Sequence, residues 1–202
     1  MLTFFHAPNS RSTSILALIK EMGIEDKIDI REVTIRRQDG SGGPDPANPH
    51  PDGKVPCLQD GDDLVYERAA VMLYLTDRFP EAGMGPLPGE PKRGTYLSWL
   101  FHYQGVIEPL MMLKWAGIDN EVLRYQMRSF EDAVAHIDAA LADGPWLLGE
   151  RMSAADLLIS GLFLFAKIEP EQPRVRDWIK RCTDRPAEKA AWAEDNAKAM
   201  NA

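Results

Sequence analysis

The stretch "KVPCLQDGDDLVYERAA", residues 54–70, reads as a β-hairpin that runs into a helix. Residues 55–58 have the apolar character of a buried strand, and residues 64–66 form a second short strand after an Asp-Gly turn. Pro56 is unusual inside the first strand, because proline has no amide hydrogen to donate to a neighbouring strand. The run from about residue 67 to residue 79 then has apolar residues at helical spacing.

The elements before the hairpin form a strand–helix–strand unit. Residues 2–6 are apolar and aromatic, as in a buried strand, and residues 15–22 carry apolar side chains at helical spacing. Residues 28–35 alternate imperfectly and read as a second strand. A helix between two strands makes parallel pairing the expected arrangement. Residues 37–53 are rich in Gly, Pro, Asp and Asn, which predicts a long surface loop.

A segment of unusual composition separates the hairpin from the rest of the chain. Residues 80–91, "PEAGMGPLPGEP", contain four prolines and three glycines, which is typical of a domain linker. Everything after this segment reads as helix. The predicted helices cover residues 92–116, 119–142, 153–167 and 173–183, with a weaker pattern over 186–200. The sequence therefore predicts an α/β part followed by an all-helical part.

The composition excludes several classes of partner. The chain has 23 basic and 31 acidic residues, a net charge of −8 and no dense block of Lys or Arg, so nucleic acid and anionic membranes are not expected partners. No apolar run approaches the ~20 residues that span a bilayer, and the N-terminus lacks a signal-peptide pattern. Cys57 and Cys182 form no CxxC pair and the four histidines are scattered, so we expect no metal site and a reducing, cytoplasmic setting.

Three segments carry a resemblance to a known family. "KVPCL" (54–58) resembles the Val-Pro signature of the glutathione transferase superfamily, and "YERAAVMLYLTDRF" (66–79) is similar to the segment that usually begins with Glu-Ser there. "LLGERMSAADLLISGLFLFA" (147–166) resembles the capped core helix of the family, with Ser153 as the cap and Asp156 three residues later. The order and spacing of the three matches are specific, and the resemblance covers nearly the whole chain.

The resemblance implies a fold and an assembly. It implies a thioredoxin-like domain with βαβ-ββα order at residues 1–80, a linker at 81–91 and an all-helical domain at 92–202. The expected fold class is therefore α/β followed by all-α. The resemblance also implies a homodimer that uses glutathione as its co-substrate.

By resemblance, the hairpin and the helix after it bind glutathione. A cis Val55–Pro56 bond turns the main chain of Val55 outward, where it pairs with the extended peptide backbone of glutathione. Glu67 takes the ammonium of the γ-glutamyl group. Arg68, where the family usually has Ser, takes its carboxylate through the guanidinium or through the backbone N–H alone. The candidates for the glycine carboxylate are Lys54, Arg36, Arg37 and Gln38.

The thiol of glutathione is expected to meet the loop between the first strand and the first helix. Asn9 falls where the family usually has Ser, Thr or Cys, Ser10 follows immediately, and Ser12 is a more distant candidate. Ser10 is the favoured catalytic residue, with Asn9 close behind, because a hydroxyl or amide hydrogen can stabilise a thiolate. The alternative is that Asn9 or Ser10 is simply the N-cap of the helix, and the two roles are compatible.

The second substrate is expected to contact the helical domain. Residues 99–115 carry aromatic and aliphatic side chains at four-residue spacing, and such a stripe usually belongs to a core. By resemblance, the start of this domain instead lines a pocket for a small hydrophobic electrophile. Tyr103 and Met111 are the candidates for this pocket, and His102 is a weaker one.

The resemblance predicts a glutathione transferase that adds the thiolate to a small apolar electrophile. Asn9, in place of Ser or Cys, leaves open a glutathione-dependent reduction of disulfides. A further alternative is a non-catalytic member of the superfamily that binds glutathione or another ligand, which the departures at Asn9 and Arg68 favour.

Overall fold

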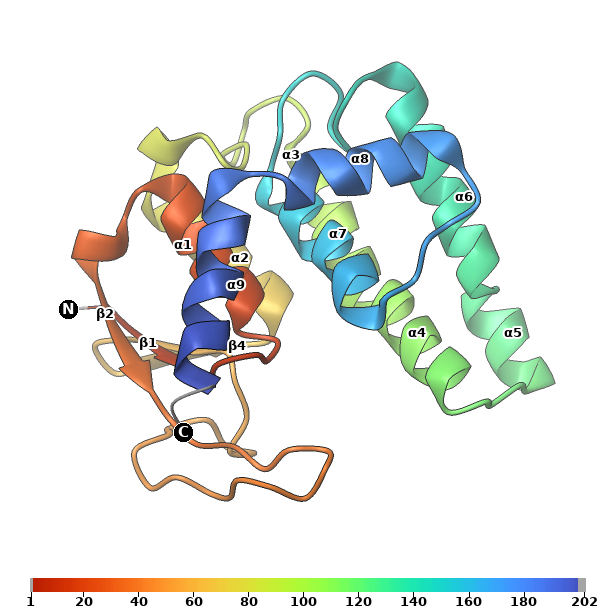
Figure 1. Ribbon diagram of the computed structural model, residues 1–202. Helices are drawn as coiled ribbons and strands as arrows, with labels where there is room; N and C mark the ends of the chain where they lie inside the picture. The colour runs from red at the N-terminus through yellow and green to blue at the C-terminus, as the bar shows by residue number, and fades with distance from the viewer. Residues whose placement is uncertain (1, 200–202) are drawn as a thin grey trace. The chain divides into compact units, whose positions relative to one another are not determined.

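The computed structural model describes residues 2–199, which form two compact units. The first unit comprises residues 2–82 and 184–199, and the second comprises residues 83–183. The β-sheet belongs to the first unit, and the second unit is built mainly of helices (Figure 1). The predicted fold class, a thioredoxin-like α/β part followed by helices, is confirmed.

The sheet of the first unit has four strands in the order β2-β1-β3-β4. Strand β1 pairs in parallel with β2 and antiparallel with β3, and β3 pairs antiparallel with β4. This is the predicted βαβ-ββα arrangement, although the second strand ends earlier than residue 35. The strands are β1 (Leu2–His6), β2 (Ile28–Glu32), β3 (Cys57–Asp60) and β4 (Asp63–Tyr66).

Three helices accompany the sheet. They are α1 (Thr13–Met22), α2 (Arg68–Arg78) and α9 (Pro186–Ala199), with 3₁₀ turns at η1 (Glu25–Lys27) and η2 (Pro80–Ala82). Ile15, Leu18 and Ile19 of α1 are fully buried, which accounts for the helical apolar pattern in the sequence. The helix ends at Gly23, whose φ of 64° suits glycine. Helix α9 lies beside α1 (Figure 1).

The place of α9 corrects a domain boundary. The sequence predicts one helical domain over residues 92–202, but α9 belongs to the first unit. Asp195 of α9 is fully buried and bonds to His6 of β1, and Glu194 lies 3.0 Å from Lys20 of α1. Polar contacts therefore hold much of α9 in place. Contacts between polar side chains produce no periodic pattern of apolar residues, so the sequence does not reveal them.

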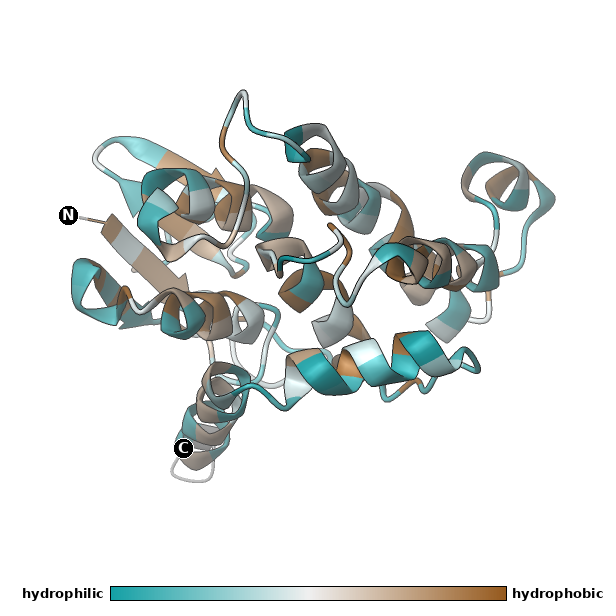
Figure 2. Cartoon of the chain, turned by 90° about the horizontal axis from the view of Figure 1, so that it is seen from above, coloured by the Kyte–Doolittle hydropathy of each residue, from teal (hydrophilic) through white to brown (hydrophobic). Residues whose placement is uncertain are grey.

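The second unit contains six α-helices and two shorter helical segments. They are α3 (Arg93–His102), the π-helical η3 (Tyr103–Ile107), α4 (Glu108–Trp115), α5 (Glu121–Met127), α6 (Phe130–Ala140), η4 (Leu141–Asp143), α7 (Ala154–Ala166) and α8 (Pro173–Thr183). Residues 154–160 of α7 are all buried, as expected for a core helix. On α8 only Val175, Trp178 and Cys182 are buried, and hydrophobic and hydrophilic residues mix along this helix (Figure 2).

N-caps decide where two of these helices begin. The Ser153 N–H donates to Asp156 Oδ2 at 2.8 Å, which confirms the predicted capping box of α7. A second capping box starts at Ser129, and Arg128 before it has a φ of 68°. The single helix predicted over residues 119–142 is therefore two helices, because the positive φ of Arg128 interrupts the helical backbone between them.

Candidate functional site

Three segments meet at one end of the sheet of the first unit. The register pairs Phe5 of β1 with Cys57 of β3, and Cys57 with Tyr66 of β4. The loop after β1, the Val-Pro step before β3 and the start of α2 after β4 therefore lie at the same end. Ala7 and Val55 pack with Phe5 and Cys57 in one buried cluster. The segments that the sequence singled out for glutathione are thus brought together.

The Val55–Pro56 peptide bond is cis, which confirms the expectation. The side chain of Val55 packs inward, since the residue is only 8% exposed. Within residues 2–199, the main-chain N–H and C=O of Val55 make no hydrogen bond. These two groups are therefore available to an extended peptide at this end of the sheet.

Glu67 and Arg68 lie where β4 leads into α2. Glu67 precedes the helix with a φ of 72°, which is uncommon for a residue other than glycine, and its side chain is exposed. Arg68 is the first residue of α2 and is 7% exposed, so little of its guanidinium reaches solvent. The helix start presents backbone N–H groups, which suit a carboxylate.

His50 is a neighbour of this site that no motif in the sequence marks. Its ring centroid lies 5.1 Å from that of Tyr66, and its Nδ1 accepts a hydrogen bond from the Asp52 N–H at 3.0 Å. Burial lowers the pKa of His50, while the charges of Asp52 and Glu67 act in the opposite direction. Only its place in the Gly/Pro-rich loop ahead of the hairpin hinted at a role, because loop residues often serve function.

Asn9 and Ser10 belong to the loop after β1, which lies at the same end of the sheet. Asn9 has a φ of 52°, and its N–H donates to Asp195 Oδ2 at 2.9 Å. Its side-chain Oδ1 is buried and has no hydrogen-bond partner among the described residues. Ser10 is partly exposed, and its Oγ accepts the Ser12 N–H at 3.1 Å. Ser10 is therefore the hydroxyl of this loop that a ligand can reach.

Ser12 has a different role from the one predicted. It is fully buried, so its hydroxyl cannot touch a ligand thiol directly. Its Oγ lies 2.8 Å from His6 Nδ1 and 2.8 Å from Ser10 Oγ. Ser12 also occupies the N-cap position of α1 but makes no side-chain capping bond, whereas Ser10 Oγ accepts the Ser12 N–H at this helix start.

Behind the loop lies a buried pair, His6 and Asp195. His6 Nε2 is 2.9 Å from Asp195 Oδ1, and both side chains are 0% exposed. Asp195 Oδ2 also accepts from the Thr13 hydroxyl at 2.5 Å. In the sequence, His6 is one of four scattered histidines. The one feature of the sequence that could have marked His6 is its position as a polar residue at the end of a mostly apolar strand.

The candidates for the glycine carboxylate are placed differently. Lys54 is exposed beside Val55, and its carbonyl accepts from Asn48 Nδ2 at 3.1 Å. The Arg37 Nη2 donates to the Pro8 carbonyl at 2.9 Å, which ties the long loop to the start of the site loop. Among residues 36–38, Arg37 is therefore the positively charged residue that contacts the loop at this end of the sheet.

Two residues predicted for the second-substrate pocket are buried more deeply than that role requires. Tyr103 and Met111, expected to line a second-substrate pocket, are both 0% exposed in the second unit and present no surface to a ligand. They belong to the core stripe that their spacing also allowed. His102, the weaker candidate, is partly exposed, and its ring packs on Trp99. Cys57 is also fully buried, and burial raises the pKa of its thiol.

Two classes of site are not found in the described part of the chain. Among residues 2–199, no cluster of three or more His, Cys, Asp or Glu side chains is arranged to hold a metal ion. None of the helices described there is long and apolar enough to cross a membrane.

Known families and proteins resemble this chain in sequence. The model of the family described as "Glutathione S-transferase, N-terminal domain" matches residues 10–78. Glutathione S-transferase F14 of Arabidopsis thaliana is 26% identical over 158 residues, and the match covers 68% of this chain and 62% of that protein. The disulfide-bond oxidoreductase YfcG of Escherichia coli is 24% identical over 209 residues, covering 93% of this chain and 92% of that protein.

A solved structure extends the similarity to the whole chain. A glutathione transferase of Methylococcus capsulatus superposes with a TM-score of 0.78 at 26% sequence identity. The match covers 98% of this chain and 100% of that one. The likeness is therefore not confined to the segment that the family model matches.

Proposed function

We propose that this chain, which belongs to the glutathione S-transferase superfamily, binds glutathione at the end of the sheet where Val55, Glu67 and residues 8–12 meet. The main chain of Val55 is the observation that carries the proposal. Its N–H and C=O make no hydrogen bond within the described residues, so they can pair with the cysteinyl backbone of the tripeptide.

The γ-glutamyl end of the ligand fits the turn before α2. We assign its ammonium to Glu67, whose exposed carboxylate lies beside the helix start. We assign its carboxylate to the backbone N–H groups at the start of α2, with Arg68 as their cationic neighbour. The glycine carboxylate at the other end is assigned to Lys54 and Arg37.

The thiol chemistry is assigned to Ser10. A free thiol has a pKa of about 8.5, so only a few per cent is ionised at neutral pH. Lowering that pKa by about two units stabilises the thiolate by about 2.7 kcal/mol relative to the thiol. Ser10 offers a partly exposed hydroxyl at the start of α1, and the thiolate then attacks a small apolar electrophile. We further propose that the protein works as a cytoplasmic homodimer.

Calorimetry with glutathione and a conjugation assay test this function together. We expect binding at or below millimolar concentration, and a loss of kcat/KM of about 100-fold in Ser10→Ala with a nearly unchanged Kd. Ser14→Ala is the matched control, because Ser14 bonds to the Arg11 carbonyl on the exposed side of the same turn. No binding at millimolar glutathione would contradict the proposal, and binding without turnover would support the non-catalytic alternative.

Asn9 favours one second function, the glutathione-dependent reduction of disulfides. Its side-chain Oδ1 is buried without a partner among the described residues, and an amide cannot form a mixed disulfide with glutathione. In such a reaction two glutathiones become one glutathione disulfide as the substrate disulfide becomes two thiols. Assaying a small disulfide beside a conjugation substrate distinguishes the two activities. Faster disulfide turnover that falls in Asn9→Ala would favour the reductase.

A further inference from the structure

A chain of hydrogen bonds leads from the candidate site to the C-terminal helix. Ser10 Oγ lies 2.8 Å from Ser12 Oγ, which lies 2.8 Å from His6 Nδ1. His6 Nε2 in turn lies 2.9 Å from Asp195 Oδ1. Ser12, His6 and Asp195 are each 0% exposed, so the chain is open to a ligand only at its Ser10 end.

The hydrogen atoms of this chain have one consistent order when Asp195 is ionised and His6 is neutral. An ionised carboxylate only accepts, so His6 donates Nε2–H to Asp195 and accepts the Ser12 hydroxyl at Nδ1. Ser12 Oγ then accepts the Ala7 N–H, at 3.2 Å, and the Ser10 O–H. The Ala7 carbonyl, 3.3 Å from Ser12 Oγ, is a more distant acceptor. Each side-chain donor of the chain therefore points from Ser10 toward Asp195, while the Ser12 N–H donates to Ser10 Oγ.

We propose that this chain is a proton relay that takes the thiol proton of bound glutathione, an inference that rests on the proposed function. The S–H bond breaks as Ser10 Oγ accepts the proton, the hydrogen of Ser10 passes to Ser12, and that of Ser12 passes to His6 Nδ1. His6 becomes an imidazolium beside the Asp195 carboxylate, and the reversed Ser10 hydroxyl donates to the thiolate. One proton moves from sulfur to imidazole without any redox step, and it returns through the same chain to solvent or the leaving group.

The surroundings of Asp195 suit this transfer. Burial raises the pKa of the Asp195 carboxyl, but hydrogen bonds from His6 and Thr13, the positive charge of a protonated His6 and the Asn9 N–H outweigh it and hold the pKa below its ordinary value. A carboxylate that stays ionised stabilises an imidazolium and fixes the ring tautomer, as the aspartate of a Ser-His-Asp triad does. The negative charge of Asp195 therefore lies beside His6, the group that receives the transferred proton.

The relay differs from a hydrolase triad in the place of its serine. A nucleophilic serine has to contact its substrate, whereas Ser12 is completely buried behind Ser10. We therefore assign Ser12 to the transfer of a proton. Ser12, His6 and Asp195 act through Ser10 and are positioning residues.

The other charges around His6 come from one strand and two helices. Glu32 of β2 stands opposite His6 in the parallel register and forms an ion pair with Lys198 of α9. Lys20 of α1 lies 3.0 Å from Glu194 of α9. These four groups are partly exposed and paired with opposite charges, so the carboxylate bonded to Nε2 dominates the field at the imidazole.

Nitrogen-15 NMR of the histidine-labelled protein tests the relay directly. Glutathione is compared with S-methylglutathione, which has the same peptide but no thiol proton, and His6→Gln assigns the His6 signals. We expect His6 to change from neutral imidazole to imidazolium with glutathione and to remain neutral with S-methylglutathione. An imidazolium before ligand is added, or the same state with both bound ligands, would overturn the relay. Failure of both ligands to bind would overturn the proposed function itself and the relay with it.

Two variants interrupt the relay away from the ligand. In Asp195→Asn we expect the titration of the bound thiol, followed by thiolate absorbance, to move up by about one pH unit. We also expect kcat at neutral pH to fall about 100-fold with a KM for glutathione within about two-fold. Glu194→Gln, the neighbouring carboxylate of α9, is the matched control. Ser12→Ala is a second interruption that retains the His6–Asp195 pair, and an unchanged thiol titration in either folded variant would overturn the relay.

Discussion

The Nε2 atom of His6 lies 2.9 Å from Oδ1 of Asp195, and both side chains are completely buried. This contact joins the first strand of the chain to its last helix. A buried polar group is destabilised when its partner is removed, because water does not reach it to replace the lost hydrogen bond. The pair therefore links the stability of the first unit to the loop that carries Ser10.

Removing one partner of this pair is expected to destabilise the protein strongly. Asp195→Ala and His6→Ala should each lower the free energy of unfolding by about 3–5 kcal/mol, since each leaves one buried polar atom, His6 Nε2 or Asp195 Oδ1, without its hydrogen-bond partner. Urea unfolding measures this loss. Glu194→Ala, on the same helix but partly exposed, should lower it by less than about 1 kcal/mol. Similar small losses in all three variants would contradict the buried-pair interpretation.

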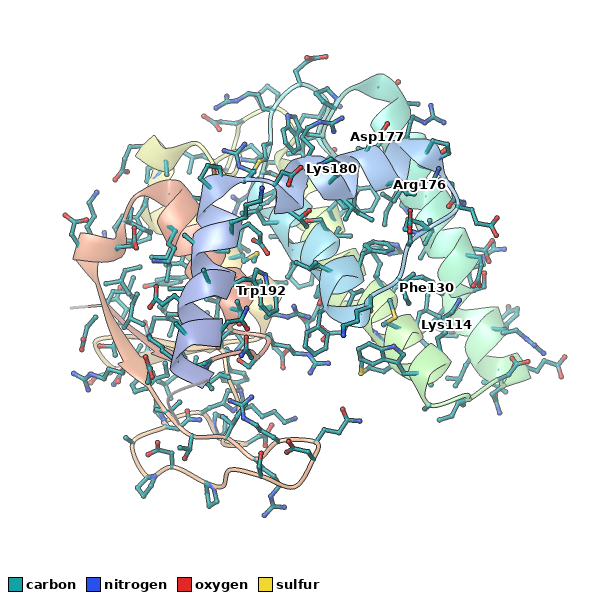
Figure 3. The ribbon with its side chains drawn as sticks, in the orientation of Figure 1. Lys114, Phe130, Arg176, Asp177, Lys180 and Trp192 are labelled. Atoms are coloured by element: carbon teal, nitrogen blue, oxygen red, sulfur yellow. The ribbon has the colours of Figure 1, made fainter. Side chains whose placement is uncertain are left out.

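Glu188 of α9 is expected to weaken the fold at neutral pH. Trp192, labelled in Figure 3, donates to Glu188 Oε1 at 2.9 Å, but burial and the charge of Glu21 raise the pKa of the Glu188 carboxyl. A carboxyl with a raised folded-state pKa loses stability as pH rises from its ordinary value through the raised one. Glu188→Gln should therefore be more stable than the parent at pH 7.

The pH dependence of the stability of Glu188→Gln provides the control for this prediction. The stability difference between Glu188→Gln and the parent should shrink as pH falls toward the ordinary carboxyl range, because the parent carboxyl becomes neutral there. Thermal unfolding of both proteins at several pH values measures this difference. A difference that does not change with pH would contradict the argument.

Asp156 is expected to be a major determinant of stability in the second unit. Its carboxylate accepts from the Leu147 N–H at 2.9 Å, the Ser153 N–H at 2.8 Å and Trp178 Nε1 at 2.9 Å. Asp156→Ala leaves these buried donors unpaired and should lower the free energy of unfolding by about 2–4 kcal/mol. Asp132→Ala is the matched control, because the same capping box lies on the surface of α6. Its loss should be about 1 kcal/mol.

Glu67→Gln is expected to weaken glutathione binding selectively. The variant keeps the shape of the side chain but removes the charge that we assign to the ligand ammonium, so Kd should rise about 10-fold or more. Calorimetry measures the change. Asp62→Asn, an exposed charge at the turn of the same hairpin, should leave Kd within about two-fold. An equal effect of both variants would mean that the ligand responds only to overall charge.

Cys57 is expected to be chemically inert in the folded protein. It is 0% exposed, and burial raises the pKa of its thiol, so the reactive thiolate is scarce. An alkylating reagent should label Cys57 only after unfolding, as mass spectrometry of the peptides can measure. Cys57→Ala should retain conjugation activity within about two-fold, whereas loss of activity in a folded variant would assign this thiol a chemical role.

Local patterns in the sequence are sufficient for most of the fold. The spacing of apolar residues predicts α1, and the hairpin with its Asp-Gly turn predicts β3 and β4. The Ser153 capping box predicts the start of α7. These features depend on residues a few positions apart, so their physics can be read along the chain. The candidate glutathione site was predicted from the resemblance carried by Val55, Pro56 and Glu67.

The tertiary structure decided which residues far apart in the sequence contact one another and which are buried. It buried Ser12 behind Ser10, placed Tyr103 and Met111 in the core, and moved α9 from the expected helical domain to the first unit. The sequence by itself determined the hairpin, its proline and the helix that follows, because each depends on its near neighbours. Only the folded chain brings Asp195 to His6, because their hydrogen bond spans 189 positions and no local periodicity encodes a contact between two polar groups so far apart.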